Sequence, residues 1–289
     1  MQASEFRAQP GTLYIVATPI GNLRDITLRA LDILKTVDLV AAEDTRVSGG
    51  LLSAYGISAK LFACHEHNER TAAAALVDQL RQGRSVALVS DAGTPGISDP
   101  GAVVVRAVRE AGLTVVPLPG ASAAATALSA AGLAEGRWLF HGFLPHKAGE
   151  RRRVLATLAG LPQGLLFYES PHRILDTVAD LATALGGERR LFIARELTKR
   201  FEEFHDCALA EALDWLQGDD NRQRGEFVLI VSGCPAETDA GLEEARRVLE
   251  ILIEDLPASQ AARLAARITG TKKNALYDFA QQLKSDRPE

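Results

Sequence analysis

Apolar and polar residues follow two alternating patterns along the chain, up to about residue 231. Short apolar runs such as 86–89 are bounded by turn residues, and longer segments such as 69–82 repeat alanine and leucine at helical spacing. A run that is apolar at every position is typical of a strand buried on both faces of a parallel sheet. Strands and amphipathic helices that alternate in this way predict an α/β fold.

The alternation occurs twice, which predicts two α/β domains. The first set of strands has the spacing of a parallel sheet of about five strands, and the runs lie at 12–18, 38–42, 86–89 and 113–117. The second set lies at 138–143, 165–168, 190–194 and 225–231. We therefore predict domains at residues 12–122 and 123–235, with a cleft between them.

Beyond Pro235 the strand-like runs stop, and helical segments follow at 242–253, at 259–267 and after Gly270. This order is typical of a helix-turn-helix module, which we place at residues 240–289. Between residues 259 and 284 there are five basic residues and one acidic residue, a net charge of +4. Such an excess is an electrostatic footprint for phosphates, although a solvated packing or dimerisation module has the same pattern.

Composition narrows the class of protein. The chain has 289 residues, of which 47% are apolar, and this suits a globular protein of two or more domains. Its three cysteines are isolated, so neither a disulfide framework nor a zinc ribbon is indicated, and a cytoplasmic location fits best. No apolar run is long enough to cross a bilayer, and the start of the chain does not resemble a signal peptide. The net charge of −5 argues mildly against nucleic acid as a partner, but it says little about local patches.

Residues 90–101, Ser-Asp-Ala-Gly-Thr-Pro-Gly-Ile-Ser-Asp-Pro-Gly, form the strongest candidate for a binding segment. They follow the run 86–89 and would leave the carboxyl edge of the sheet, where open α/β sheets bind ligands at the reversal of strand order. Three glycines permit unusual backbone angles, and two prolines stiffen the path. We name residues 90–101 the ligand loop; an ordinary Gly/Pro-rich turn is the alternative.

Other polar segments also end expected strands. Residues 43–46 would lie at the same sheet edge as the ligand loop, and residues 169–173 and 195–203 end strands of the second domain. Solvated helix starts and local ion pairs are the alternative explanation for these charges. The turn at residues 120–122, Gly-Ala-Ser, opens a helix and is either a seat for an anion or a plain N-cap.

His65 and His67 form a His-x-His pair, which is a possible start of a metal site. On a strand the two side chains would share a face, but no third ligand stands at a convincing spacing. We therefore predict no metal site. Asn68 is more simply explained as the cap of a helix at 69–82.

Several motifs, taken in order, resemble one known family. They are 13–26 (LYIVATPIGNLRDI), 42–46 (AEDTR), 90–101, 119–122 (PGAS), 142–145 (GFLP), 168–173 (YESPHR) and 195–199 (RELTK). Together they closely resemble the ribosomal RNA small subunit methyltransferase I family, over about residues 12–284.

This resemblance implies a fold, a cofactor and a reaction. The fold would be two α/β domains of the tetrapyrrole-methylase (class III) type with a cleft between them, plus a small helical, helix-turn-helix-like module. The cleft would hold S-adenosyl-L-methionine, and the usual assembly would be a homodimer. The reaction would be 2′-O-methylation of a cytidine ribose in the decoding centre of 16S rRNA, in the small ribosomal subunit.

Carried over by position, the resemblance also implies which residues contact the cofactor. The contacts would be made largely by the backbone, which suits a ligand with a ribose, a carboxylate and a purine. The residues are Asp91, Ala92, Gly93, Thr94, Ile97, Ala121, Ser122, Tyr168, Ala194, Gly225, Glu226 and Phe227.

A ribose hydroxyl is a poor nucleophile until its proton is removed, so a carboxylate or histidine near the cleft could act as a general base. We predict Glu169, Glu196 and Asp25 as catalytic residues, and His172, Glu203, Glu43 and Asp44 are further candidates. Basic side chains would hold rRNA phosphates or a flipped-out nucleotide. These are Arg24, Arg46, Arg173, Arg195, Lys199, Lys272 and Lys273. For the charged residues at 169–173 and 195–196, ion pairing at the domain interface is the alternative explanation.

Two other functions remain open on the same fold. One is methylation of a small tetrapyrrole, against which the basic tail and the arginine-rich rims argue. The other is a non-catalytic nucleotide-binding or ribosome-assembly factor. The absence of Gly-x-Gly-x-x-Gly and of Gly-x-x-x-x-Gly-Lys argues against a dinucleotide oxidoreductase or a P-loop enzyme.

Overall fold

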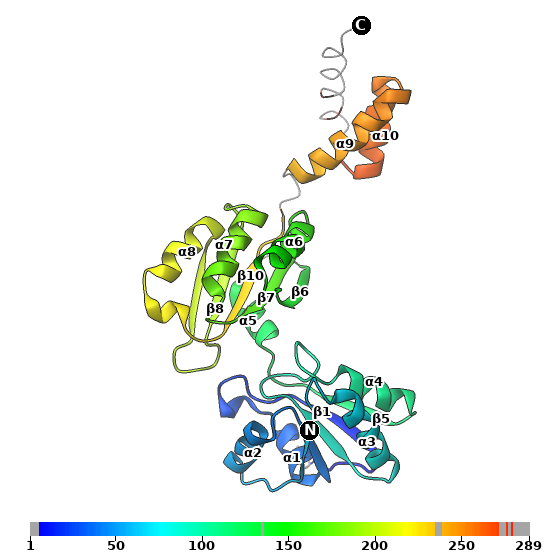
Figure 1. Cartoon of the computed structure of the whole chain (residues 1–289), viewed down its shortest axis with the longest axis vertical. Helices are drawn as coiled ribbons and strands as arrows, with labels where there is room; N and C mark the ends of the chain where they lie inside the picture. Colours follow the sequence, from blue (N-terminus) through cyan, green and yellow to red (C-terminus); the bar gives the residue numbers. More distant parts are fainter. Residues whose placement is uncertain (1–5, 134–135, 235–238, 272–275, 277–278, 280–289) are drawn as a thin grey trace, which may run out of the picture.

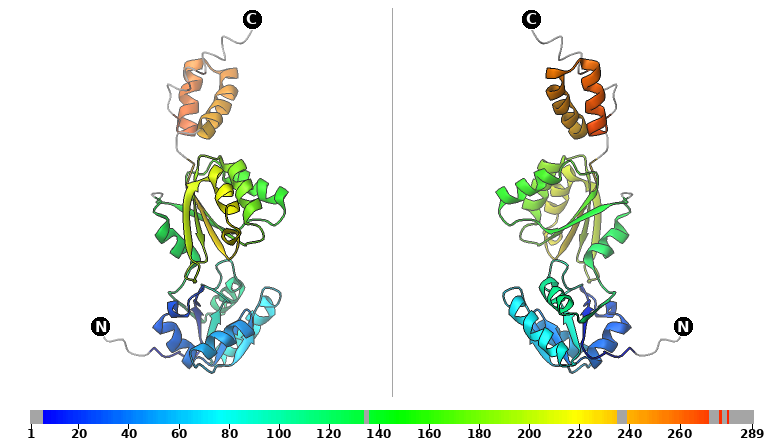
Figure 2. Two further views of the ribbon diagram at one scale, coloured as in Figure 1. Left: turned by 90° about the vertical axis from the view of Figure 1, so that its left-hand side faces the viewer. Right: turned by 90° about the vertical axis from the view of Figure 1, so that its right-hand side faces the viewer.

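The computed structural model of the chain describes residues 6–133, 136–234, 239–271, 276 and 279. The chain forms two sheet-containing parts and a small helical part, which follow one another along its longest axis (Figure 1). The side views show the same order (Figure 2). No helix in the described part of the chain is both long and apolar enough to cross a membrane. The described residues also contain no group of three or more His, Cys, Asp or Glu side chains that could hold a metal ion.

The first sheet is parallel throughout and has the order β3-β2-β4-β1-β5. Its strands are β1 (Thr12–Val16), β2 (Leu39–Ala42), β3 (Leu61–Ala63), β4 (Val86–Val89) and β5 (Thr114–Leu118). Its helices are α1 (Leu28–Thr36), α2 (Thr45–Ala54), α3 (Glu69–Arg81) and α4 (Ala102–Glu110).

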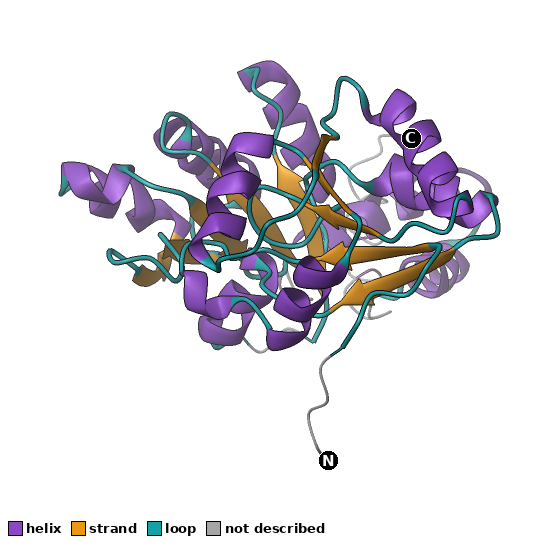
Figure 3. Ribbon diagram, turned by 90° about the horizontal axis from the view of Figure 1, so that it is seen from below, coloured by secondary structure: helices purple, strands orange, loops and turns teal. Residues whose placement is uncertain are grey.

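Both faces of this sheet are buried, which explains why its strands are apolar without alternation. On β1, Leu13 and Ile15 belong to a core that contains residues of α3 and α4. Tyr14 and Val16, which point to the opposite face, belong to a second core with residues of α1 and α2. Seen from below, helices lie on both sides of the strands (Figure 3).

The second sheet is mixed and has the order β6-β7-β10-β8-β9. Its strands are β6 (Trp138–Phe143), β7 (Gly164–Glu169), β8 (Arg190–Arg195), β9 (Glu203–Ala208) and β10 (Phe227–Val231). The central strand β10 runs antiparallel to both of its neighbours, β7 and β8. Helices α6 (Ala148–Leu158), α7 (Ile174–Leu185) and α8 (Leu209–Gln217) pack on one face. Helix α5 (Ala123–Ala131) covers the other face, where Ala127 and Ala131 contact the core of this sheet.

The C-terminal part has a hydrophobic core of its own. Helix α9 (Asp239–Asp255) packs on α10 (Ala258–Thr269) through residues such as Leu249 and Ala265, joined by Leu276. This arrangement and the two sheets confirm the predicted fold class. Lys272 and Lys273, which we predicted to contact RNA, lie outside the described residues.

Some elements were not predicted from the sequence. Strands β3 and β9 both lie at sheet edges, and helices α2 and α8 follow β2 and β9. β9 exposes alternate positions and carries Glu203, His205 and Asp206, so it lacks the apolar run by which the other strands were recognised. Asn68 does not cap α3 with its side chain; its Oδ1 instead accepts a hydrogen bond from the His65 N–H at 2.8 Å.

The buried centre of the second sheet predicts a selective loss of stability. Leu229 on β10 is fully buried, so Leu229→Ala should lower the free energy of unfolding by about 2–5 kcal/mol. Both tryptophans of the chain, Trp138 and Trp215, belong to this part, so tryptophan fluorescence during urea denaturation reports on it. The matched control is Leu139→Ala on β6, where the leucine is 38% exposed and the loss should stay below about 1 kcal/mol. Equal losses would contradict the central position of β10.

Candidate functional site: a pocket between the two sheets

The order of the first sheet reverses between β1 and β4, and the loops that follow these two strands meet there. The Thr18 N–H donates to the Gly93 carbonyl at 2.8 Å, and the Gly93 N–H donates to the Thr18 carbonyl at 3.0 Å. The Thr18 hydroxyl donates to the Ser90 carbonyl at 3.0 Å. The ligand loop is therefore fixed at the switch point, the position where α/β sheets bind ligands.

The rest of the ligand loop is held by two further anchors. The Thr94 hydroxyl donates to the Ala121 carbonyl at 2.9 Å, which joins the loop to the turn before α5. At its other end, Glu69 Oε1 accepts hydrogen bonds from the N–H groups of Gly101 and Val103, at 2.7 and 3.1 Å. Gly93 has a φ of +80°, which a side chain would strain.

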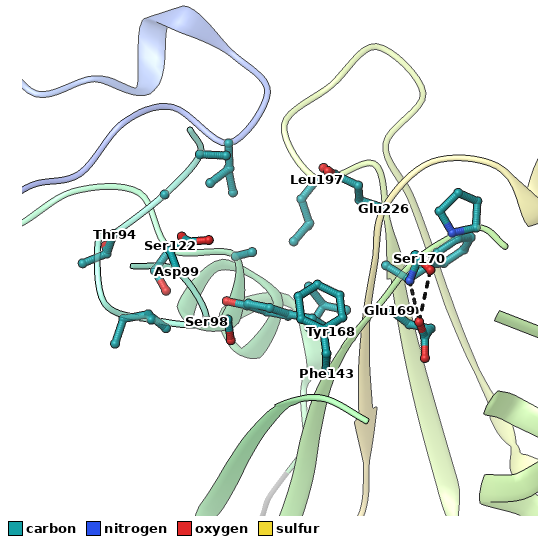
Figure 4. Close-up of a pocket in the computed structure, with 18 residues that line it drawn as sticks. Thr94, Ser98, Asp99, Ser122, Phe143, Tyr168, Glu169, Ser170, Leu197 and Glu226 are labelled. Carbon is teal, nitrogen blue, oxygen red and sulfur yellow. Dashed lines mark hydrogen bonds between the residues drawn. The ribbon is translucent and has the colours of Figure 1, made fainter. Parts of the chain in front are cut away.

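The second sheet supplies the opposite wall. Because β10 is antiparallel to β7 and β8, its first residues lie beside the last residues of those strands. Phe227 is paired with Glu169 on β7 and with Arg195 on β8. Tyr168 and Glu226 are thus brought to the same sheet edge, which faces the ligand loop (Figure 4).

Between these walls lies a cavity of about 300 Å³. This volume is at the lower end of the range for small-molecule sites. The Tyr168 ring, with Phe140 and Phe143 edge-on at 5.0 and 5.7 Å, forms an aromatic wall. The Tyr168 hydroxyl accepts a hydrogen bond from the Ala124 N–H at 3.1 Å, at the start of α5. Backbone-rich loops opposite an aromatic face fit a nucleoside, and the Asp99 carboxylate in the lining fits a positive charge.

Most of the residues predicted to contact the cofactor line this pocket. They are Ala92, Gly93, Thr94, Ile97, Ser122, Tyr168, Glu226 and Phe227. Four others are not in the lining and have different contacts. Asp91 Oδ1 accepts a hydrogen bond from the Asp44 N–H, and the Ala121 carbonyl accepts one from the Thr94 hydroxyl. Ala194 is buried in the core of the second sheet, and Gly225 lies against the Glu196 side chain.

Sequence reasoning missed several lining residues. Ile20 and Leu197 belong to motifs that we quoted, but their apolar side chains carry no chemical signal by themselves. Ser98 and Asp99 lie within the ligand loop, where a carboxylate inside a glycine-rich segment was the available signal. Phe143 closes the aromatic side of the cavity.

Glu169, predicted as catalytic, is held inside the second sheet. Its side chain has no exposed area, and its Oε2 accepts from the Thr177 hydroxyl at 2.7 Å and pairs with Arg173 at 3.2 Å. Its Oε1 accepts from the Ser170 N–H at 2.7 Å. Both oxygens are engaged by donors, so this carboxylate anchors the end of β7, and its catalytic role stays a prediction.

Glu196 is engaged in a similar way in the loop after β8. Its Oε1 accepts from Lys199 Nζ at 2.7 Å and from the Glu226 N–H at 3.0 Å. Burial raises the pKa of Glu196, but these hydrogen bonds outweigh it and hold the pKa below its usual value. Glu196 and Thr198 also have positive φ angles of 53° and 65°, so the network holds a strained loop.

Asp25, the third predicted catalytic residue, lies in the short 3₁₀ helix Leu23–Asp25. It is exposed and is not part of the pocket lining. The same segment presents Arg24, which is also exposed. The loop before this helix lies against the loop after β8: a Cβ added at Gly21 would overlap the Lys199 side chain.

The predicted phosphate-binding arginines divide into two groups. Arg195 is 7% exposed and donates to Glu203 Oε2 and to the carbonyls of Asn221 and Arg224. The Arg173 side chain is 13% exposed and donates to the Leu144 carbonyl at 2.7 Å. These two guanidinium groups stabilise the second sheet, and their contact with RNA stays a prediction. The Arg46 side chain is 90% exposed, although it pairs with Asp44, and its hydrogen bond lowers the pKa of Asp44 to about 2.

Solved structures define the class of fold. A cobalt precorrin-4 methyltransferase, CbiF, superposes with a TM-score of 0.57 at 18% identity, over 77% of this chain and 95% of that chain. A uroporphyrin-III-C-methyltransferase from Thermus thermophilus gives a TM-score of 0.54 at 21% identity, over 77% and 94% of the two chains. The family described as Tetrapyrrole (Corrin/Porphyrin) Methylases matches residues 12–213. The two sheets and their cleft therefore have the tetrapyrrole-methylase fold.

The particular branch of this class follows from closer relatives. The chain is 53% identical to the "Ribosomal RNA small subunit methyltransferase I" of Escherichia coli O157:H7, over 93% of this chain and 94% of the relative. The protein of the same name from Pseudomonas aeruginosa is 52% identical, over 94% and 97%. Residues 239–284 match the family described as RsmI C-terminal HTH domain. The chain thus belongs to the ribosomal RNA small subunit methyltransferase I family, as predicted, and the cofactor S-adenosyl-L-methionine follows from this membership.

The contact between Gly225 and Glu196 predicts a loss of cofactor binding. Gly225 has a φ of +90°, and a Cβ there would overlap the Glu196 carboxylate. Gly225→Ala should therefore displace Glu226 and Phe227 at the pocket wall. We expect S-adenosylmethionine to bind about 10- to 100-fold more weakly by calorimetry, because a strained residue of this kind costs about 1–3 kcal/mol.

The control for this variant is Gly149→Ala in α6. No atom lies within 4 Å of a Cβ built at Gly149, and its φ is ordinary. Cofactor affinity should stay within about twofold of the wild type, since the substitution touches nothing at the site. If Gly225→Ala also left the cofactor affinity unchanged, the hydrogen bonds of Glu196 would not be needed for cofactor binding.

Proposed function

We propose that this chain transfers the methyl group of S-adenosyl-L-methionine to the 2′-oxygen of a cytidine ribose in the decoding centre of 16S rRNA. The observation that carries the proposal is the 53% identity to a ribosomal RNA small subunit methyltransferase over 93% of the chain. That match extends over both sheets and the C-terminal helices. The cytidine, the 2′-oxygen and the decoding centre come from the resemblance in the sequence motifs.

The pocket supplies what a methyl donor needs from a protein. When bound, S-adenosylmethionine provides a methyl group on a positively charged sulfur. The backbone of residues 92–94 and of Phe227, the Ser122 hydroxyl and the Tyr168 ring are placed to hold its parts. Fixing the methyl carbon and the acceptor oxygen about 3–3.5 Å apart is a large part of the catalysis that a rigid, water-excluding pocket can provide.

RNA would be held by exposed basic residues outside the pocket. Arg24 is exposed in the 3₁₀ helix after β1, and Arg46 is exposed in the first turn of α2 after β2. The loops before these helices contact neighbours of the pocket through Gly21 and Asp44. On α10, Arg263 and Arg267 are exposed one turn apart. Lys199 is 29% exposed but pairs with Glu196 and Glu226, so its main role in this proposal is to hold the pocket wall.

The two alternative functions have less support. The tetrapyrrole methyltransferases among the solved structures share 18–21% of residues with this chain, and this level of identity is informative for the fold alone. A non-catalytic assembly factor is disfavoured by the 53% identity to a protein named as a methyltransferase. A homodimer is part of our proposal, because Leu139 and Phe140 expose apolar surface on the edge strand β6, outside the pocket lining. The cytoplasm is the proposed location.

The proposed reaction has a direct test. The purified protein is incubated with methyl-labelled S-adenosylmethionine and either 30S subunits, naked 16S rRNA or a porphyrinogen. We expect label in the ribosomal substrate, and alkaline hydrolysis should leave the labelled nucleotide in an uncleaved dinucleotide, since a 2′-O-methyl group blocks this cleavage. Label in the porphyrinogen, or label on a base, would contradict the proposal, and cofactor binding without any transfer would favour an assembly factor.

The role of the C-terminal helices is tested by charge removal on α10. Arg263→Ala with Arg267→Ala should weaken binding to the 30S substrate and lower the slope of log K against log salt by about 1.4–1.8, because each of the two lost phosphate contacts contributes about 0.7–0.9. Cofactor affinity should not change. The matched control is Arg247→Ala on α9, whose guanidinium already pairs with Glu244 at 3.1 Å. An equal loss of cofactor binding in the double variant would contradict an RNA-binding role.

A further inference from the structure

We propose that the exposed ring of Phe201 is the surface on which the base of the acceptor nucleotide stacks. This inference rests on the proposed function and concerns its RNA side. Phe201 lies in the loop between β8 and β9 and is 64% exposed, more than any other phenylalanine in the described part of the chain. None of the hydrophobic cores formed by the described residues includes it. The ring is therefore not needed to hold the fold together.

The loop between β8 and β9, residues 196–202, leads from the pocket to its rim. Leu197, near the start of the loop, lines the pocket and points into it in Figure 4, whereas Phe201 is not among the lining residues. Between these two residues, the Lys199 side chain lies against Gly21 in the loop after β1. Phe201 thus follows at the rim, outside the space that the cofactor would fill.

Hydrogen bonds hold the backbone on both sides of this ring. The Thr198 N–H donates to Glu202 Oε2 at 2.6 Å, and the Glu202 N–H donates to the Lys199 carbonyl at 3.2 Å. Lys199 Nζ in turn donates to Glu196 Oε1 at 2.7 Å. A side chain presented on a fixed backbone loses little conformational freedom when a ligand binds, so the exposed ring is preorganised for a flat partner.

The neighbouring charge favours a nucleotide as that partner. The Arg200 guanidinium lies 5.5 Å from the centre of the Phe201 ring. Arg200 is exposed and has no ion pair among the described residues, whereas Arg195 and Lys199 are paired with glutamates. Unpaired RNA bases are recognised by stacking on aromatic rings and on arginine guanidinium planes. Phe201 and Arg200 therefore offer a flat apolar face for a base and a positive charge for a phosphate.

The size of the pocket explains why the base needs a surface at the rim. The cavity of about 300 Å³ is at the lower end of the range for small-molecule sites, and S-adenosylmethionine occupies it in the proposed reaction. The acceptor ribose approaches the methyl group, which leaves its base outside the cavity. A base taken out of its RNA stack loses stacking energy, and an aromatic side chain replaces part of that energy.

The other exposed aromatic residue nearby has a structural contact. Phe204 on β9 is 43% exposed, but its ring stacks on Phe192 at 5.7 Å, and Phe192 belongs to a core of the second sheet. The strand β9 also lies at the opposite edge of the sheet from β6, the strand on which we place the dimer contact. Phe201 therefore lies apart from both the sheet core and the proposed dimer contact.

The test compares Phe201→Ala, Phe201→Leu and Phe201→Trp in the full chain. Single-turnover methylation is measured as a function of the concentration of 30S subunits, with saturating S-adenosylmethionine. Cofactor affinity is measured by calorimetry, and the oligomeric state is measured by sedimentation.

We expect Phe201→Ala to lower the apparent second-order rate constant about 5- to 150-fold, which is the usual effect of removing an aromatic side chain that stacks on one base. Phe201→Leu should show a comparable loss, because leucine keeps the apolar volume without a flat ring. Phe201→Trp should stay within about threefold of the wild type, since it keeps an aromatic face. Cofactor affinity should stay within about twofold in all three variants, because Phe201 does not line the pocket.

The matched control is Phe6→Ala. Phe6 is 40% exposed and also has an arginine over its ring, with the Arg29 guanidinium 5.3 Å from the ring centre. The Phe6 N–H donates to Asp32 on α1, and Phe6 does not line the pocket. Removal of this ring should change the rate constant by less than about twofold.

Several results would overturn the inference. A Phe201→Ala rate constant within about twofold of the wild type removes the ring from RNA recognition. A wild-type rate constant in Phe201→Leu shows that apolar volume suffices without stacking. Altered sedimentation of Phe201→Ala identifies an interface between copies of the chain, and weaker cofactor binding makes Phe201 a cofactor contact. If the wild-type chain labels no ribosomal substrate, the proposed function itself fails, and the stacking role fails with it.

Discussion

The double hydrogen bond between Thr18 and Gly93 is the contact on which the rest of the site depends. It joins the loops after β1 and β4, the two strands between which the sheet order reverses. Each of the two residues donates its N–H and accepts a hydrogen bond at its carbonyl oxygen. The backbone groups of both residues are therefore satisfied at a buried position. The ligand loop can therefore keep its remaining backbone groups directed at a pocket without the loop collapsing into it.

The wall opposite that contact depends on strand direction. A parallel β10 would bring Phe227 to the far end of the sheet, whereas the antiparallel β10 sets it beside Glu169 and Arg195. The buried pairs Glu169–Arg173 and Arg195–Glu203 then fix the ends of β7 and β8. Charges that resemble catalytic or RNA-binding groups in the sequence thus hold the frame of the pocket, since a buried ion is stable only when it is paired and hydrogen-bonded.

The sequence predicted the elements whose pattern is local and left open those that depend on distant partners. The bounds of β4 and β6 were predicted from their apolar runs, and the ligand loop from its glycines and prolines. The edge strand β9 was missed because Glu203, His205 and Asp206 interrupt any apolar run. The YESPHR motif also does not show that the Glu169 carboxylate accepts a hydrogen bond from Thr177, eight residues later. Asp99 was passed over because its burial and its nearness to Glu43 arise only when the ligand loop is folded.

The way the pocket is built separates donor from acceptor recognition. Its donor side consists largely of backbone groups and close approaches at glycine, which tolerate change in most side chains provided that the chain path is kept. This is consistent with a shared fold at 18–21% identity in proteins named as methyltransferases of tetrapyrroles. In our proposal, recognition of the acceptor depends on side chains at the rims and on the C-terminal helices, which have a hydrophobic core of their own and can change independently of the pocket.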